Sequence, residues 1–144
     1  MKNDLPEDLF LPDEGEYPPA LTEKYELLEC LSEKNDTRTI LAKERESEEL
    51  CVVKCFLKGS PLYEKSEPRA LRELQIAPFP CFRGEYAGEQ MRCVVRTYIP
   101  GTPLSEMPDD AFRTEEEVIR IGEALCDQLT TLHSLPTPVI HRDI

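Results

Sequence analysis

A lysine lies inside the most strongly apolar short segment of the chain, Leu50–Phe56. Side chains alternate between the two faces of a strand, so Lys54 shares one face with Val52 and Phe56. An ammonium group in an apolar stripe is stabilised by an anion, and the alternative is a strand-edge lysine whose head reaches water. Lys54 is therefore the first candidate for contact with an anionic ligand or a carboxylate.

A carboxylate that can pair with this lysine lies in the next predicted helix. Glu73 belongs to the segment Ala70–Leu74, whose pattern favours a helix. Glu64 and Glu67 compete for the same role, but they lie nearer Pro68, where regular helix is less expected. Taken alone, a glutamate on a helix is usually solvated surface, so Glu73 gains weight only together with Lys54.

The elements that must position these residues follow from periodicity and turn residues. A helical segment is expected from near Ser66 or Glu67 to about Ala77, ended by prolines. A second helix is expected from Thr114 to Ser134, with a capping-box pattern formed by Thr114 and Glu117. Strands are expected at 25–31, 39–42, 50–56, 82–86 and 91–98, with a polar turn at 32–38.

The tripeptide His141-Arg142-Asp143 follows the second helix and two prolines. This order, three strands with lysine in the third, a helix, two strands, a long helix and a His-Arg-Asp loop, resembles the amino-terminal lobe of a protein kinase. The resemblance covers about residues 25–144 and is of bacterial Ser/Thr type. It implies an α+β fold, a five-stranded antiparallel sheet plus one helix, followed by the first long helix of a second lobe truncated just after His-Arg-Asp.

Three regions follow from this resemblance. Residues 1–24 are acidic and proline-rich and are expected to form a flexible lead-in, with Leu9, Phe10 and Leu11 able to attach to a surface. Residues 25–99 correspond to the kinase-like lobe, and residues 100–144 to the hinge and the start of the second lobe.

The resemblance also implies the chemistry, which is ATP-dependent phosphoryl transfer to protein hydroxyls. Lys54 would bind the α- and β-phosphates, Glu73 would orient Lys54, and Asp143 would accept the proton of the substrate hydroxyl. His141 and Arg142 would be structural and regulatory. The family's Mg²⁺ ligands follow the His-Arg-Asp loop and have no counterpart in these 144 residues, so little or no kinase activity is expected from them alone.

The predicted nucleotide site departs from the family pattern. Kinases cover the phosphates with a glycine-rich loop, whereas Ser32, Lys34 and Thr37 stand at the three glycine positions. The charges of Glu33 and Asp36 in the same segment would oppose a triphosphate. Thr39 replaces the usual adenine-packing valine, and Arg96 falls at the normally apolar gatekeeper position, which predicts weak ATP affinity or an unusual pose. The residues expected to line the nucleotide are Lys54, Ser32, Lys34, Thr37, Thr39, Val52, Tyr98 and Ile99.

Two other functions remain open on the sequence. A pseudokinase-like module would bind a partner without transferring phosphate, and the glycine-free loop and Arg96 favour it. A small-molecule kinase of the aminoglycoside or choline type shares the architecture, but the arginine of His-Arg-Asp favours protein kinases. A zinc site is improbable because the chain has only two histidines.

Composition limits the partners further. A net charge of -12 argues against nucleic acid and anionic membranes. The six cysteines lie in apolar runs, which favours buried free thiols in a reducing cytosol, and no stretch reaches the roughly 20 apolar residues of a membrane span. A cytoplasmic protein is expected. The apolar stripe Val118–Leu132 would lack its usual neighbours and predicts self-association.

Overall fold

The computed structural model describes residues 12–61, 63, 72, 74–75, 79–111 and 114–141. The chain divides into two compact units, the first made of Met1–Glu67 and Leu74–Ile99 and the second of Pro68–Glu73 and Pro100–Ile144. The first unit contains all five strands, and the second contains the long helix. The predicted helix near 66–77 lies almost entirely outside the described residues.

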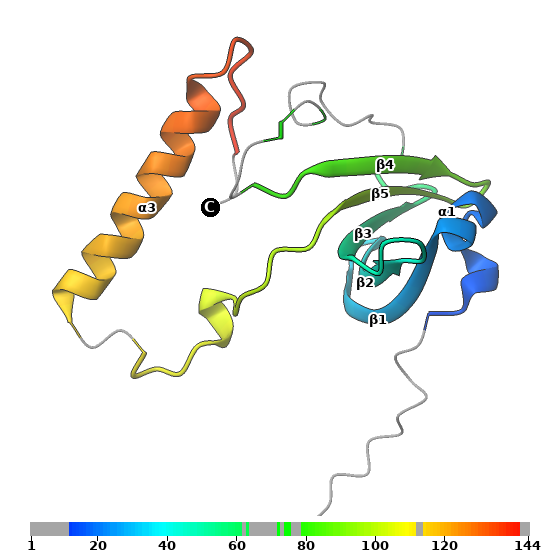
Figure 1. The fold of residues 1–144 in the computed structure, drawn as a ribbon, viewed down its shortest axis with the longest axis horizontal. Helices are drawn as coiled ribbons and strands as arrows, with labels where there is room; N and C mark the ends of the chain where they lie inside the picture. The colour runs from blue at the N-terminus through cyan, green and yellow to red at the C-terminus, as the bar shows by residue number, and fades with distance from the viewer. Residues whose placement is uncertain are drawn as a thin grey trace, which may run out of the picture. The chain divides into compact units, whose positions relative to one another are not determined.

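The first unit is built on one five-stranded antiparallel sheet with the strand order β1-β2-β3-β5-β4 (Figure 1). All five predicted strands are confirmed, and their observed ends differ from the predicted ends by at most a few residues. The strands are β1 (Tyr25–Lys34), β2 (Thr37–Glu44), β3 (Leu50–Leu57), β4 (Phe82–Ala87) and β5 (Met91–Thr97). Neighbouring strands therefore exchange hydrogen bonds along nearly their full length.

The hairpin between β1 and β2 is tighter than the sequence predicts. The polar turn expected at 32–38 is wrong, because Lys34 pairs directly with Thr37 and only two residues remain between the strands. Asn35 and Asp36 have φ angles of 50° and 59°. Asparagine and aspartate tolerate this left-handed region better than other non-glycine residues, and a two-residue hairpin turn of this kind matches the twist of its strands.

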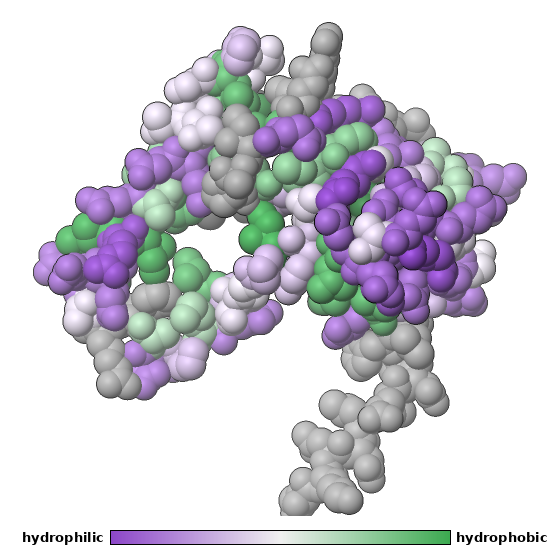
Figure 2. Space-filling model, in the orientation of Figure 1, coloured by the Kyte–Doolittle hydropathy of each residue, from purple (hydrophilic) through white to green (hydrophobic). Residues whose placement is uncertain are grey.

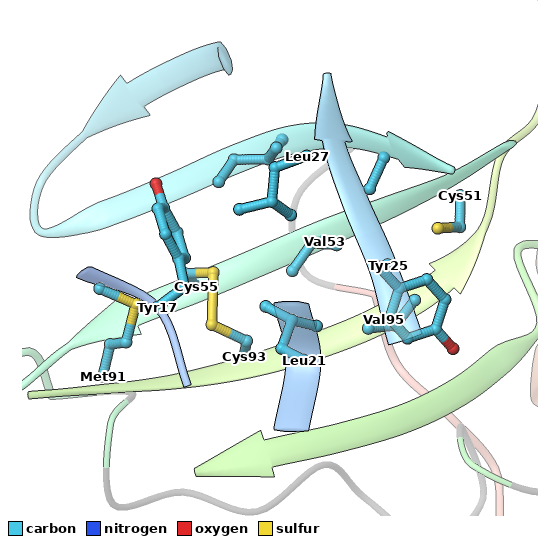
Figure 3. Packing of buried hydrophobic residues seen from close by; sticks show 12 residues of the cluster. Tyr17, Leu21, Tyr25, Leu27, Cys51, Val53, Cys55, Met91, Cys93 and Val95 are labelled. Atoms are coloured by element: carbon cyan, nitrogen blue, oxygen red, sulfur yellow. A yellow bond between two sulfur atoms is a disulfide. The ribbon is translucent and has the colours of Figure 1, made fainter. Parts of the chain in front are cut away.

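One face of the sheet carries the hydrophobic core, and we call it the core face. Ile40 of β2, Val53 of β3 and Val95 of β5 are fully buried there, each with 0% exposure. Figure 3 shows these strands contributing side chains to one continuous cluster. The cluster consists of Tyr17, Leu21, Tyr25, Leu27, Ile40, Ala42, Cys51, Val53, Cys55, Met91, Cys93 and Val95.

The chain before β1 is part of this core, which corrects the expected flexible lead-in over residues 12–24. A 3-10 helix, η2 (Glu14–Glu16), leads into the short helix α1 (Pro19–Lys24). Proline suits the first helical turn, because the amide N–H that it lacks has no partner within the helix there. Tyr17 and Leu21 pack into the cluster, and Leu21 is fully buried (Figure 3). Leu9, Phe10 and Leu11 lie outside the described residues.

The cysteines also differ from expectation. Cys55 of β3 lies directly opposite Cys93 of β5, and their sulfurs form a disulfide in the core (Figure 3). The expected buried free thiol is found at Cys51, whereas Cys126 is exposed. The pairing follows from the strand register, which brings together two side chains separated by 38 residues in sequence.

The second unit contains η3 (Leu104–Glu106) and the helix α3 (Glu115–His133). The predicted capping box is confirmed, because the Thr114 hydroxyl accepts from the Glu117 amide and the Glu117 carboxylate accepts from the Thr114 amide. Hydrophobic residues are visible on α3 in Figure 2, and Val118 is 56% exposed. No helix in the described ranges is long and apolar enough to cross a membrane.

Candidate functional site

Lys54 lies on the face of the sheet opposite the core, which we call the lysine face. Along β3, Cys51, Val53 and Cys55 belong to the core cluster, so alternation directs Val52, Lys54 and Phe56 to the other side. The Lys54 side chain is exposed, and its Nζ lies 5.8 Å from the centre of the Phe56 ring. The strand thus presents a cation beside an aromatic ring and away from the core.

The strand register brings predicted nucleotide residues together around Lys54. Ser32 of β1 lies directly opposite Thr39 of β2, and Thr39 lies directly opposite Lys54. Directly opposite residues share a face, so two hydroxyls and the ammonium group form one row across three strands. The next row toward the hairpin turn holds Lys34, Thr37 and Phe56 in the same way.

The lysine-face row continues onto β5 and β4 with Val94 and then Glu85. The Glu85 carboxylate accepts from the Arg92 guanidinium at 2.6 Å, and both side chains are largely buried, with exposures of 20% and 12%. The Arg92 guanidinium also lies 4.9 Å from the centre of the Phe56 ring. Within the part of the chain that the structure describes, Lys54 makes no ion pair of its own.

Arg92 and Glu85 are site residues that sequence reasoning missed. The alternation of β5 was the available signal, since Arg92, Val94 and Arg96 occupy every second position of that strand. The pairing of Arg92 with Glu85 could not be inferred, because the register of β4 against β5 brings Ala87 opposite Arg92 and leaves Glu85 two residue pairs away.

Arg96 also lies on the lysine face, directly opposite Val52. Its guanidinium donates to the Pro80 carbonyl at 3.2 Å. Burial lowers the pKa of Arg96, because desolvation disfavours the charged form. The predicted gatekeeper arginine is therefore half-buried and tied to the chain that enters β4.

Tyr98 and Ile99, the last two residues expected to line the nucleotide, follow β5 directly. The Tyr98 amide donates to the Leu50 carbonyl at 3.3 Å, which extends the pairing of β5 with β3 by one residue. Ile99 is 46% exposed and ends the first compact unit.

The remaining predicted catalytic residues lie outside the described residues. Glu73 and Asp143 are both among them, as is Arg142, so the Lys54–Glu73 pair and the role of Asp143 stay predictions. His141 is described and exposed. Among the residues that the structure describes, no group of three or more His, Cys, Asp or Glu side chains is placed to hold a metal ion.

One expected obstacle to phosphate binding is absent from the lysine face. Glu33 lies directly opposite Arg38 in the β1–β2 pair, and Arg38 lies opposite the core residue Cys55, so both side chains belong to the core face. Their ion pair has an Nε–Oε1 distance of 3.0 Å. The Glu33 charge, expected to repel a triphosphate, is therefore neutralised on the far side of the sheet.

Comparison with known proteins identifies the fold. No protein-family model matches the sequence, and no curated protein matches it. A solved structure of Rad53 residues 1–466 in complex with AMP-PNP aligns with a TM-score of 0.65 at 18% sequence identity, and Rad53 is a protein kinase. The chain has a protein-kinase-like fold. The alignment covers 85% of this chain and 33% of that chain.

The likeness fits the element order found here. Five antiparallel strands, followed in the sequence by a long helix, give an α+β fold that matches an amino-terminal kinase lobe. In this kinase-like unit the third strand carries Lys54 away from the core. The predicted fold class is thus confirmed.

Proposed function

We propose that the lysine face of the kinase-like unit binds ATP, and that the unit belongs to a Ser/Thr protein kinase of bacterial type. The observation that supports this most directly is the row of Ser32, Thr39 and Lys54 across three adjacent strands. It offers the Lys54 ammonium group and the Ser32 hydroxyl to a ligand's phosphate oxygens, and Thr39 lies between them for contact with the ribose or base. Rad53, which has this fold, was crystallised with AMP-PNP.

The electrostatics of the first unit favour one position for the phosphates. The chain carries a net charge of -12, so an anionic ligand needs a local cation. Lys54 and Lys34 both lie on the lysine face, whereas Glu33 and Glu85 are paired with arginines. Val52 lies next to Lys54 on the same face and offers an apolar contact for the base. The proposed lining also includes Thr37, Tyr98 and Ile99.

In the proposed reaction the γ-phosphoryl group leaves the ADP oxygen and joins a hydroxyl oxygen of a protein substrate. Lys54 holds the phosphate oxygens, Glu73 orients Lys54, and Asp143 takes the proton that the hydroxyl loses. When bound, Mg²⁺ neutralises phosphate charge in such reactions. The described residues do not fit a magnesium site, so we assign none here.

A pseudokinase-like binding module is the second candidate function. The tight Asn35-Asp36 turn has no glycine amides to close over phosphates, and Arg96 occupies the lysine face beside Val52. Both features favour a unit that binds a partner, or nucleotide without transfer. The two candidates differ in their response to ATP.

Thermal melting with and without Mg-ATP separates these functions. A ligand at about 100 times its Kd stabilises a protein by about 2.7 kcal/mol. We expect this shift for the wild type, and its loss in Lys54→Met. Lys43→Met is the matched control, because Lys43 lies on a neighbouring strand and pairs with Glu26 at 3.1 Å. No shift in the wild type would favour the binding module, and an equal shift in Lys54→Met would contradict the role of Lys54.

The 144-residue polypeptide itself should bind ATP without transferring phosphate. The reason is that the magnesium ligands of the family follow the His-Arg-Asp loop, and charge neutralisation is the main source of catalysis in this reaction. Radiolabelled ATP and a generic protein substrate provide the assay. Measurable transfer by this polypeptide would show that other groups supply the missing charge.

We also propose that this polypeptide self-associates through α3. Val118 and Leu125 of the predicted stripe are 56% and 39% exposed, whereas Leu132 is buried. Burying exposed aliphatic side chains is favourable at roughly 25 cal/mol per Å² of apolar surface. Sedimentation should show a dimer that Val118→Asp dissociates, and a monodisperse wild-type monomer would contradict this proposal.

The proposed location is the cytoplasm, and the cysteines provide its test. A reducing cytosol keeps most thiols free. We therefore expect Cys55 and Cys93 to be reduced in cells and to bond only in oxidising buffer. Trapping of the Cys55–Cys93 bond in freshly quenched cells would contradict a cytoplasmic location.

A further inference from the structure

Arg38 contacts the β1–β2 hairpin on the core face, the side opposite the proposed nucleotide site. This residue lies on the core face of β2, between the lysine-face residues Thr37 and Thr39. Its Nη1 donates to the Glu16 carboxylate at 2.7 Å, and its Nε donates to the Glu33 carboxylate at 3.0 Å. One guanidinium thus joins both hairpin strands to the segment before β1.

That segment, Asp13–Lys24, is itself firmly attached, and we call it the strap. Burial raises the pKa of the Tyr17 hydroxyl, although the neighbouring Arg38 opposes the rise. Arg45 contacts the strap near both of its ends, since it donates to the Glu14 carboxylate at 3.2 Å and to the Thr22 carbonyl at 3.0 Å. With Leu21 in the core, the strap has anchors along its whole length.

The turn of the hairpin has a further anchor at its tip. The Leu57 amide donates to the Asp36 carbonyl at 2.9 Å, which ties the turn to the end of β3. The hydrogen bond to Glu16 is the largest influence on Arg38 and raises the pKa of its guanidinium. Arg38 therefore keeps its positive charge.

We infer that the strap is a positioning element of the nucleotide site. Through Arg38 it fixes the hairpin, so that Ser32, Lys34 and Thr37 are already aligned with Lys54 before a ligand arrives. A loop with glycines closes over its ligand by moving, whereas a prealigned hairpin avoids the entropy of ordering on binding. This inference rests on the proposed ATP site, and it assigns Glu16 and Arg38 as positioning residues.

Glu16→Gln tests the inference because electrostatics and positioning predict opposite changes in ATP affinity. The substitution removes a negative charge, so electrostatics alone would strengthen ATP binding, whereas loosening the hairpin weakens it. We expect the Kd for ATP to rise about fivefold, the lower end of typical coupling between sites. The Kd for adenosine should not change, because the hairpin faces the phosphates. If Glu16 only stabilised the fold, the substitution would change the Kd for ATP and the Kd for adenosine alike.

Glu49→Gln is the matched control. Glu49 also pairs with an arginine, Arg83, at 2.8 Å, but it belongs neither to the strap nor to the hairpin. Glu49→Gln removes the same negative charge as Glu16→Gln, and its ATP affinity should equal or exceed that of the wild type. In Glu16→Gln/Arg38→Gln the ATP affinity should equal that of Arg38→Gln alone, because both substitutions break one connection.

Hydrogen exchange without nucleotide keeps the two proposals separate. Amides of residues 31–39 should exchange faster in Glu16→Gln than in the wild type, with no change in Glu49→Gln. Unchanged exchange in Glu16→Gln would contradict the claim that the strap fixes the hairpin, whether or not ATP binds. Faster exchange with an unchanged ATP Kd overturns the positioning role. Absence of ATP binding by the wild type overturns the proposed function itself and, with it, the positioning role.

Discussion

The two faces of one sheet differ sharply, and β3 shows the difference between adjacent residues. Val53 has 0% exposure on the core face, whereas Lys54, the next residue, is exposed on the lysine face. The core face receives the strap and a disulfide, while the lysine face gathers hydroxyls and lysines. Together with the proposed ATP site, the comparison assigns stability to the core face and ligand binding to the lysine face, with Arg38 and the strap as the proposed connection between them.

The largest effect is expected where the strap enters the core face. Leu21→Ala removes a fully buried side chain and should lower the free energy of unfolding by about 2–5 kcal/mol. Urea denaturation followed by circular dichroism measures the loss. Leu31→Ala is the control, because Leu31 is 48% exposed and should change stability little. Equal effects of the two substitutions would mean that the strap is not part of the core.

The disulfide provides the second stability test of the core face. Reduction of Cys55–Cys93 should lower the free energy of unfolding by about 2–4 kcal/mol, because the reduced unfolded chain is less constrained. The measurement compares urea unfolding with and without reductant. The free energy of unfolding of the double variant Cys55→Ala/Cys93→Ala should not depend on the reductant. If the wild type were equally independent of the reductant, the bond would not form in solution.

Stability at alkaline pH probes Cys51 on the same face. Burial raises the pKa of its thiol from the ordinary 9.0 to about 11. Between these values the folded chain holds a proton that the unfolded chain has lost, so the free energy of unfolding falls as pH rises through this window. The pKa values of Tyr17 and Tyr25 are also raised and act in the same direction.

Cys51→Ala isolates the contribution of this one thiol to the loss of stability at alkaline pH. Urea unfolding is measured from about pH 8 to about pH 11, and the variant should lose stability less steeply than the wild type. Identical slopes would indicate that Cys51 titrates normally and is not sealed from water.

The smallest effect is expected on the lysine face. Thr39→Val replaces a hydroxyl with a methyl group where a nucleotide base or ribose would pack. Added apolar contact of about 0.8 kcal/mol should tighten ATP about fourfold with little change in melting temperature. Isothermal titration calorimetry measures the Kd. Weaker binding would show that the Thr39 hydroxyl itself contacts the ligand.

Much of the fold was predictable because its signals are local. The five strands follow from alternating apolar residues, and α3 follows from the Thr114 capping box and the stripe that ends at Leu132. The face of Lys54 was also predictable, because alternation needs only the strand itself.

The remaining features depend on contacts between distant segments. Tyr17, Leu21 and Tyr25 recur every fourth residue, but the surrounding prolines and acidic residues hid this pattern. The pairing of Cys55 with Cys93 depends on the register of β3 against β5. Two positive φ angles decided the length of the hairpin turn, since polar residues alone predict a longer loop.

The most direct test of the account is a methyl NMR titration of the 144-residue chain with ATP. Val52 and Val53 are neighbours in sequence but lie on opposite faces of β3. The account predicts that the Val52 methyl signals shift with ATP while those of Val53 and Leu21 stay in place. Shifts of Val53 and Leu21 without Val52, or no shift at all, would contradict a nucleotide site on the lysine face.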